Sequence, residues 1–318
     1  MKYRPRHVIE YAAVRALAWI MNALPYRAAL FVGWLLAGLA FHVIRFRRRE
    51  TERRIRQVFG GDYPAAAVRR IAWQSLRNLA FTTVDAMRGP ALTLARFRAT
   101  TDTAAVERLA DPLRRQIATG RGAIVASPHF GWWELGAPAL ALCDIPIFAI
   151  AAKQRNPLFD AYLNRTRAAM GMEIILRGTA ALRGTLGALQ AGKVLVVLPD
   201  VRMRTPGLAI RFLGGVANIG PGMAQFARHA NVPIFLTITV RTGWTQHSLR
   251  VHPPITPDPA VDKHQDLQRM TQQALTLIEE TIRADPGQWF WYNQRWVLEP
   301  VPSMGSPEND VDSAPRSR

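Results

Sequence analysis

The sequence predicts an α/β fold in which helices flank a mostly parallel mixed sheet, behind an N-terminal helical membrane anchor. Two observations predict it. Short, continuous apolar runs alternate with helix-like segments along the chain, which is typical of strands buried on both faces of a parallel sheet. A long apolar stretch near the N-terminus ends in a cluster of arginines, which is typical of a membrane anchor with its positive end in the cytoplasm.

The anchor is predicted over residues 1–50. From Ala28 to Ile44 only His42 is strongly polar, and no cleavage site of a secretory signal follows. A helix needs about 20 apolar residues to cross a bilayer, so spanning and shallow insertion are both open, as is a buried helical hairpin in a soluble core. By the positive-inside rule, the arginines that follow lie near headgroups on the cytoplasmic side: Arg45, Arg47, Arg48 and Arg49.

A single domain over residues 51–300 is predicted to begin with amphipathic helices between 51 and 88. One apolar stripe there has helical spacing: Val68, Ile71, Ala72, Ser75, Leu79 and Val84. Continuous apolar runs predict strands at 122–129, 145–152, 193–200 and 232–240, with helices between them at 157–170 and 179–191. The polar, Pro- and Ser-rich tail, residues 301–318, is predicted to be disordered.

The charge of the chain indicates an anionic partner. Its 318 residues include 41 Lys and Arg against 23 Asp and Glu, a formal net charge of +18. Nucleic acid, an acidic membrane surface and an acidic protein would all suit this charge. The single cysteine, Cys143, lies in an apolar run typical of a buried structural thiol. Motifs for metal, nucleotide or a serine nucleophile are missing, so we expect neither metal nor cofactor.

The candidate chemistry centres on the stretch ASPHFGWWELGAP, residues 126–138. His129 falls at the carboxyl end of the first strong strand, where open parallel sheets bind ligands. Positions five apart on one helix are rotated by about 140°, so Glu134 reaches His129 only if the helix begins near Gly131. A carboxylate on one ring nitrogen would fix the tautomer and leave the other nitrogen to take a proton.

A second acid competes with Glu134 as the partner of His129. Asp200 ends the apolar run KVLVVLPD, and the carboxyl ends of parallel strands meet at one edge of a sheet. A helix or turn cap is the ordinary alternative for an aspartate that follows a proline. Either acid can therefore orient His129, and the sequence leaves the choice open.

Several motifs, in a fixed order, resemble one family of enzymes. After the apolar N-terminus come SPHFGWWE, KQRNPLFDAYLNRTRAAMGMEII, LPDVRM, RFLGG, NIGPGMAQFARHANVPIF and PGQWFWYNQRW. With these motifs the chain resembles the lipid A biosynthesis acyltransferases of the lauroyl and myristoyl type over most of its length. In that family a histidine and an acid separated by four residues form an HX4[D/E] motif, which His129 and Glu134 match here.

The resemblance implies a glycerolipid-acyltransferase-like fold, an activity and partners. A fatty acyl group would pass from an acyl carrier protein or CoA thioester to a hydroxyl of a lipid A precursor or related membrane glycolipid, with His129 as general base. The enzyme would work on the cytoplasmic side of the bacterial inner membrane, without a nucleic-acid partner. In some members the second acid, here Asp200, takes the place of the HX4[D/E] acid.

Further substrate contacts are expected at the same edge of the sheet. Backbone N–H groups near Gly131, next to Trp132, would donate to the tetrahedral oxyanion. Guanidinium groups suit a lipid or phosphopantetheine phosphate, and the matched segments supply Arg155, Arg165, Arg167 and Arg202. Asn218 and Asn293 depart from the threonine and histidine that the family more often has, and Asn293 cannot titrate. The tryptophans of the last motif suit core packing and seating at a membrane interface equally: Trp289, Trp291 and Trp296.

Three other functions remain open at this point. The acceptor could be another lipid, either a phospholipid or an aminolipid. A membrane-bound lipid or thioester hydrolase would use His129 to activate water instead of an alcohol. A non-catalytic basic protein that binds membranes or nucleic acid would leave the histidine and acids at the strand ends unexplained.

Overall fold

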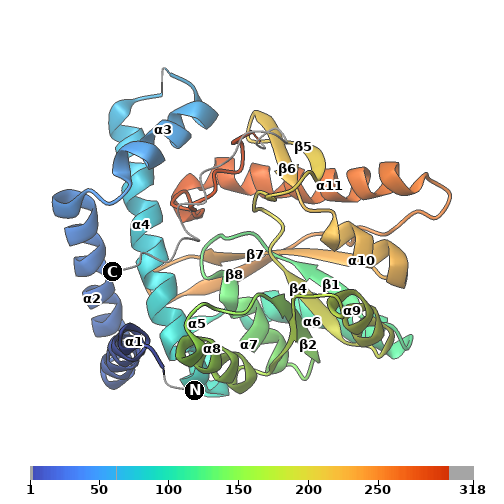
Figure 1. The fold of residues 1–318 in the computed structure, drawn as a ribbon, viewed down its shortest axis with the longest axis horizontal. Coiled ribbons are helices and arrows are strands. Elements are labelled where there is room, and N and C mark those ends of the chain that lie inside the picture. The colour runs from blue at the N-terminus through green and yellow to red at the C-terminus, as the bar shows by residue number, and fades with distance from the viewer. Residues whose placement is uncertain (1–2, 62, 301–318) are drawn as a thin grey trace.

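A computed structural model describes residues 3–61 and 63–300. A six-stranded sheet of order β3-β2-β4-β1-β7-β8 forms its middle layer (Figure 1). All neighbouring strands are parallel except β7 and β8, which confirms the predicted α/β class with a mostly parallel sheet. Its strands are β1 (Ala123–Ala126), β2 (Ile147–Ala151), β3 (Met172–Leu176), β4 (Val194–Val197), β7 (Ile234–Arg241) and β8 (His247–Val251). The tail predicted to be disordered, 301–318, lies outside the described residues.

The strands predicted from continuous apolar runs are all present, as β1, β2, β4 and β7. The sequence analysis did not identify the edge strands β3 and β8, nor the antiparallel hairpin of β5 (Leu208–Phe212) and β6 (Gly215–Ile219). Alternate residues of β5 are buried and exposed, and the exposed Arg211 interrupts the apolar run. Edge strands likewise have fewer covered positions than central ones, and their sequences are correspondingly mixed.

Helices cover both faces of the sheet. Ile124 and Ala126 of β1 belong to a core shared with α4, α10 and α11, whereas Ala123 and Val125 belong to a second core shared with α6 and α7. This two-sided burial accounts for the continuous apolar runs of the central strands. The helices of the domain are α3 (Arg48–Phe59), α4 (Ala65–Arg88), α5 (Leu94–Thr100), α6 (Thr103–Ala118), α7 (Gly136–Ala141), α8 (Pro157–Ala169), α9 (Ala181–Gln190), α10 (Gly222–Ala230) and α11 (Lys263–Ala284).

The predicted helical segments agree with these bounds. Helices α8 and α9 occupy the segments predicted at 157–170 and 179–191, and α3 and α4 occupy the segment at 51–88. All members of the apolar stripe on α4 are buried except Leu79, which is half-buried against the same core. The break between α3 and α4 falls at Gly60, whose φ of 95° suits a glycine.

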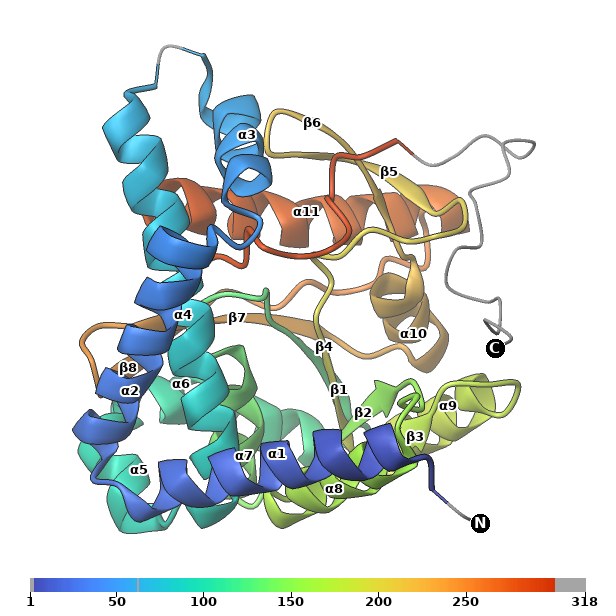
Figure 2. The ribbon, with the colours of Figure 1, turned by 60° about the vertical axis from the view of Figure 1, so that its left-hand side comes forward.

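Two N-terminal helices precede the domain and pack on it. Helix α1 is Pro5–Ala23, and α2 (Tyr26–Gly38) continues into a π-helical turn, η1 (Leu39–Ile44). Figure 2 shows α2 running beside α4; Leu30 shares a small core with Phe81 and Val84. The hydroxyl of Tyr26 donates to Asp85 at 2.7 Å, which ties α2 to α4.

The outer side of these two helices is apolar. In the described part of the chain, Tyr26–Ile44 is the one helix long and apolar enough to cross a membrane. Its exposed side carries Phe31, Leu35, Leu36, Leu39, Val43 and Ile44, and α1 exposes Val8, Ile9, Trp19 and Ile20. A hairpin buried in a soluble core, the alternative left open by the sequence, would not expose these side chains.

The arginines that follow the anchor were expected to face headgroups together, and two of them instead have protein partners. Arg47 donates to the carbonyl oxygen of Tyr292 at 3.3 Å. Arg48 pairs with Glu52 at 2.9 Å and lies over the ring of Phe41. Arg45 and Arg49 are exposed. The cluster therefore joins the N-terminal helices to the domain as well as adding positive charge to its surface.

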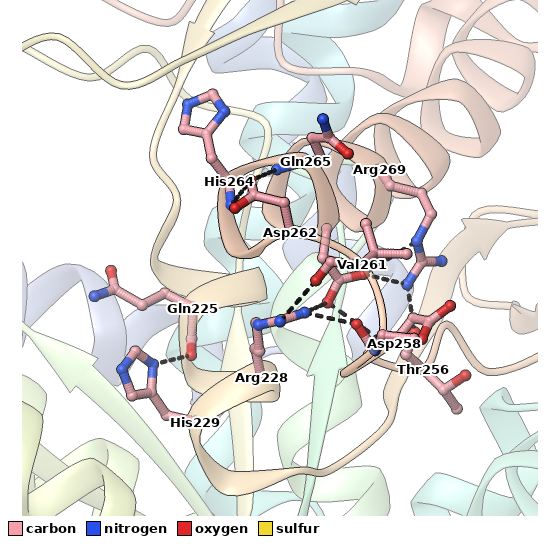
Figure 3. Close-up of polar contacts among 12 residues, drawn as sticks. Gln225, Arg228, His229, Thr256, Asp258, Val261, Asp262, His264, Gln265 and Arg269 are labelled. Carbon is pink, nitrogen blue, oxygen red and sulfur yellow. Dashed lines mark hydrogen bonds and ion pairs between the residues drawn. The ribbon is translucent and has the colours of Figure 1, made fainter.

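A buried carboxylate connects α10 to α11, and its two partners, Arg228 and Arg269, are labelled in Figure 3. Asp266, in the first turn of α11, has no exposed side-chain surface and accepts hydrogen bonds from Arg228 and Arg269, both at 2.6 Å. Burial alone would raise its pKa, but the two guanidinium groups outweigh burial and lower it. Helix α10 lies against β1 and β7, and α11 packs on α10 and on β5.

Candidate active site

The loop after β1 and the loop after β4 bring a histidine and an aspartate together. The backbone N–H of Ser127 donates to the carbonyl oxygen of Val197 at 3.0 Å, which extends the parallel pairing of the two strands toward the site. Nδ1 of His129 lies 2.8 Å from Oδ1 of Asp200, and the backbone N–H of His129 donates to Oδ2 at 2.8 Å. The structure thus makes Asp200 the direct partner of the imidazole.

A tryptophan from the C-terminal segment holds the aspartate. Nε1 of Trp289 donates to Oδ2 of Asp200 at 2.9 Å, so the carboxylate accepts three hydrogen bonds. Only 1% of the Asp200 side chain is exposed. Burial would raise the pKa of Asp200, but the charge of His129 and these hydrogen bonds outweigh burial and lower it. Asp200 is therefore an ionised acceptor at neutral pH.

The same pairing fixes the state of His129. Because an ionised carboxylate can only accept, Nδ1 carries the proton and Nε2 has the lone pair. Burial lowers the pKa of His129, but the charge and hydrogen bond of Asp200 raise it above the ordinary value, with a smaller contribution from Glu134. One fifth of the side chain remains exposed, so a hydroxyl can reach the ring. This geometry suits a general base.

Glu134 lies close to this pair without contacting the imidazole. The chain makes a 3₁₀ turn, η3 (Trp133–Leu135), shortly after Gly131, so the predicted helical turn is present and carries Glu134. No hydrogen bond joins Glu134 to His129 in the described residues. Desolvation of its carboxyl by the surrounding protein raises the pKa of Glu134, although the charges of Arg167 and His129 lower it. Glu134 therefore acts on the imidazole by its charge, at longer range than Asp200.

Aromatic rings that the sequence analysis did not select form the wall beside His129. The ring of Trp133 is centred 5.3 Å from the imidazole, and Phe290 stacks on Trp133 at 6.0 Å. The backbone N–H of Phe290 donates to the carbonyl oxygen of His129 at 3.0 Å. Phe290 belongs to the motif PGQWFWYNQRW, so the last motif contacts the first one through this residue.

The structure gives Gly131 and Trp132 roles in the protein interior. The N–H of Gly131 donates to the carbonyl oxygen of Gln288 at 3.1 Å, so this group is not the free oxyanion donor that was expected. The ring of Trp132 is only 4% exposed and packs edge-on against the buried His247 at 5.1 Å. Trp132 therefore faces the core, whereas its neighbour Trp133 faces the histidine.

Replacing Gly131 with alanine should damage both the fold and the site. Gly131 has a φ of 55°, and an added Cβ would lie 2.2 Å from the carbonyl oxygen of Thr239. The left-handed backbone alone costs about 1–2 kcal/mol, and the clash adds to it. We expect thermal unfolding to show a loss above about 2 kcal/mol and turnover to fall with it. The matched control is Gly136→Ala, where a Cβ meets nothing within 4 Å; equal stability of the two variants would contradict this assignment.

The four arginines predicted to bind substrate lie in different parts of the domain. Arg202 is 7% exposed, donates to the carbonyl oxygen of Pro300, and leaves its buried Nε without a partner in the described residues. Arg155 is exposed in the loop between β2 and α8. Arg167 acts on Glu134, whereas Arg165 lines a groove between α8 and α1. We expected Arg165 at the edge of the sheet, but on α8 it faces the groove next to α1 instead.

Arg202 belongs to a basic cluster beside the aspartate. The pKa of Arg295 is lowered by burial and by the positive charges of Arg204, Arg202 and Arg177. Arg177 directly follows β3, while Arg202 and Arg204 follow Asp200, so the cluster lies at the carboxyl edge of the sheet. None of the four forms an ion pair with a carboxylate within residues 3–61 and 63–300. Such a cluster favours an anionic ligand.

Other candidate chemistry is not supported. Cys143 is half-buried, and burial raises the pKa of its thiol, which opposes a nucleophilic role. Among the described residues no group of three or more acids, histidines or cysteines could hold a metal ion. Trp289, Trp291 and Trp296 are all at most 4% exposed, so core packing, rather than membrane seating, explains them.

A histidine held by a buried aspartate at the ligand-binding edge of a parallel sheet defines an acid/base site of the kind found in enzymes. Comparison with known proteins identifies the family: residues 2–297 match the family described as bacterial lipid A biosynthesis acyltransferase. The chain belongs to this family of lipid A biosynthesis enzymes and is an acyltransferase.

Two curated relatives cover nearly the whole chain. The lipid A biosynthesis palmitoleoyltransferase of Escherichia coli (strain K12) is 25% identical over 301 residues, which cover 93% of this chain and 94% of the relative. The lipid A biosynthesis acyltransferase of Shigella flexneri gives the same identity and coverage. The family resemblance expected from the motifs is thereby confirmed.

Proposed function

We propose that this protein transfers a fatty acyl group from an acyl-carrier-protein or CoA thioester to a hydroxyl of a lipid A precursor, with His129 as general base. The observation that carries the proposal is the pair formed by His129 and the buried Asp200. We further propose that the domain is glycerolipid-acyltransferase-like, because its strand-end histidine and acids match that type of site.

Each step of the proposed reaction uses side chains of the candidate active site. Nε2 of His129 takes the proton of the acceptor hydroxyl as its oxygen attacks the thioester carbonyl carbon. The tetrahedral oxyanion then collapses, the carbon–sulfur bond breaks, and the imidazolium returns the proton to the thiolate. Asp200 stabilises the imidazolium by a charge-assisted hydrogen bond, and Glu134 adds a second negative charge at longer range. A base of this kind typically contributes about 10²- to 10⁴-fold.

The basic cluster at the sheet edge is proposed to receive a phosphate of one of the substrates. Nε of Arg202 has no partner in the described residues, and the charges of Arg202, Arg204 and Arg177 all act on Arg295. The acceptor lipid and the phosphopantetheine arm of the donor both carry phosphate. Arg155, on the neighbouring loop, is the remaining candidate for this contact.

Membrane association is proposed to be interfacial, on the cytoplasmic face of the inner membrane. One side of α2 packs on α4 and its opposite side is apolar and exposed, which fits a helix lying in the headgroup region better than one surrounded by lipid. The acceptor lipid then reaches the site by diffusion within the membrane surface. The net charge of +18 suits an anionic leaflet and an acidic carrier protein.

Polar substitutions on the exposed side of α2 and η1 should weaken membrane binding without unfolding the domain. We expect Leu35→Ser combined with Leu39→Ser to lower partitioning onto phosphatidylcholine vesicles in high salt by more than about tenfold, because each leucine loses apolar burial. The matched control is Val216→Ser, which removes an exposed apolar side chain on β6, away from α2. Sedimentation that is unchanged in the double variant would contradict the interfacial assignment.

The experiment that tests the proposed function measures release of the carrier thiol with and without acceptor. A transferase releases thiol when a lipid A precursor is present and forms the acylated product in equal amount. The alternative of a hydrolase, in which His129 activates water, predicts thiol release and free fatty acid without acceptor. Release that depends on a phospholipid or aminolipid instead would support the alternative acceptor.

A further inference from the structure

A groove lies between the N-terminal helix α1 and helix α8, close to the end of α4. Figure 2 shows α1 running alongside α8. The groove has a volume of about 490 Å³. Its polar and aromatic walls come from α1 and α8, through Arg15, Trp19, Asn22, Tyr162 and Arg165.

Two guanidinium groups from different helices face this groove. Arg15 lies over the ring of Tyr162, 5.4 Å from its centre. Arg165 makes no hydrogen bond or ion pair within the described residues, and no aspartate or glutamate lines the groove. The amide of Asn22 is already used, since it donates to the carbonyl oxygens of Ala18 and Met87. The groove therefore offers two cations to an anionic ligand.

The remaining wall of the groove is apolar and continuous with the exposed side of α1. Met87, Pro90 and Ala91 line it, and Trp19, at its rim, is 73% exposed. Ile20 is exposed beside Trp19 on the same helix. A ligand that matches this surface carries a negative charge next to hydrocarbon, which is the chemistry of an anionic lipid.

The groove is distinct from the reaction centre. Residues two apart on a helix are rotated by about 200°, so Arg165 and Arg167 lie on opposite sides of α8. Arg167 acts on Glu134, beside His129, whereas Arg165 faces α1. A lipid bound in the groove therefore does not place its headgroup at the imidazole.

We propose that this groove binds the phosphate of an anionic bilayer phospholipid, with Arg15 and Arg165 as its ligands. The bound lipid is not the reacting one; it seats α1 on the membrane. Because α8 carries Arg165 on one side and Arg167 on the other, the lipid also holds in place the helix whose Arg167 acts on Glu134.

The test compares vesicle binding of the full chain with that of Arg15→Gln/Arg165→Gln. Vesicles of phosphatidylcholine with and without phosphatidylglycerol are the probes, and Arg69→Gln/Arg250→Gln is the matched control, since it removes two exposed arginines outside the groove. Arginines near an anionic surface strengthen binding to it, so the control should lose some affinity for phosphatidylglycerol through general charge. We expect the groove variant to lose at least about tenfold more than the control.

Three results would overturn the proposal. Equal losses in the two double variants would mean that only net charge matters. If soluble glycerol 3-phosphate displaced the protein from vesicles as effectively as added vesicles do, the groove would be assigned to a free phosphate compound. A raised KM for the acceptor with unchanged phosphatidylglycerol binding would assign it to the substrate. Vesicle binding does not depend on turnover, so His129→Ala should retain the preference for phosphatidylglycerol even if the proposed function fails.

Discussion

His129→Ala is expected to lower acyl transfer by at least about a hundredfold while leaving the fold and vesicle binding intact. Without the imidazole, the acceptor hydroxyl must attack with its proton still bound, and no described residue replaces Nε2 at that position. The side chain is one-fifth exposed and lies beyond the end of β1, and Asp200 keeps the backbone N–H of residue 129 and Nε1 of Trp289 as donors, so unfolding should remain close to that of the wild type.

The measurement is acceptor-dependent thiol release, together with thermal unfolding. His264→Ala is the matched control, because His264 is exposed at the start of α11 and should be dispensable. More than about a tenth of the wild-type rate in His129→Ala would be incompatible with a base that contributes 10²-fold or more.

Asp200→Asn is expected to cost more than Glu134→Gln. Asp200 contacts the imidazole at 2.8 Å, whereas Glu134 reaches it only through charge, so we expect losses in kcat of at least about a hundredfold and about tenfold respectively. Glutamine and asparagine keep the shapes of the two acids, so the difference reports on charge. Similar losses in both variants would give the HX4E acid a role equal to that of Asp200.

The pH profile separates a direct electrostatic partner from a merely structural residue. The base form of His129 is required, so kcat/KM should rise as pH increases through its pKa, which Asp200 holds above the ordinary value. Removing the charge of Asp200 lowers that pKa, so the acidic limb of the profile should move to lower pH even though the maximum falls. An acidic limb that stays in place in Asp200→Asn would show that the aspartate does not set the charge state of His129.

Most of the fold was predictable because each central strand produces an apolar run within its own segment of the sequence. A strand covered on both faces needs a continuous apolar run, which is why β1, β2, β4 and β7 were found and the edge strands were not. The hairpin of β5 and β6 escaped detection because its alternation of buried and exposed residues interrupts the apolar run.

The residues of the active site were predictable, but which acid contacts His129 was not. The position of His129 and Asp200 at strand ends follows from the sequence, because parallel strands end at one edge. Which acid contacts the ring depends on the order of strands in the sheet: β4 is the neighbour of β1, so the loop after β4 brings Asp200 against His129. Strand order is set by long-range packing and leaves no mark in the local pattern.

The sequence by itself determined the enzyme family, the central strands, the apolar N-terminus and the residues that can carry acid/base chemistry, because each depends on residue type and spacing. Only the tertiary structure decided that Trp133 faces His129 while Trp132 is buried, that Trp289 holds Asp200, and that Arg165 faces α1. These facts depend on which segments meet in space. A side chain's partner is chosen by the packing of elements far apart in the chain, and adjacent residues in a turn point in different directions.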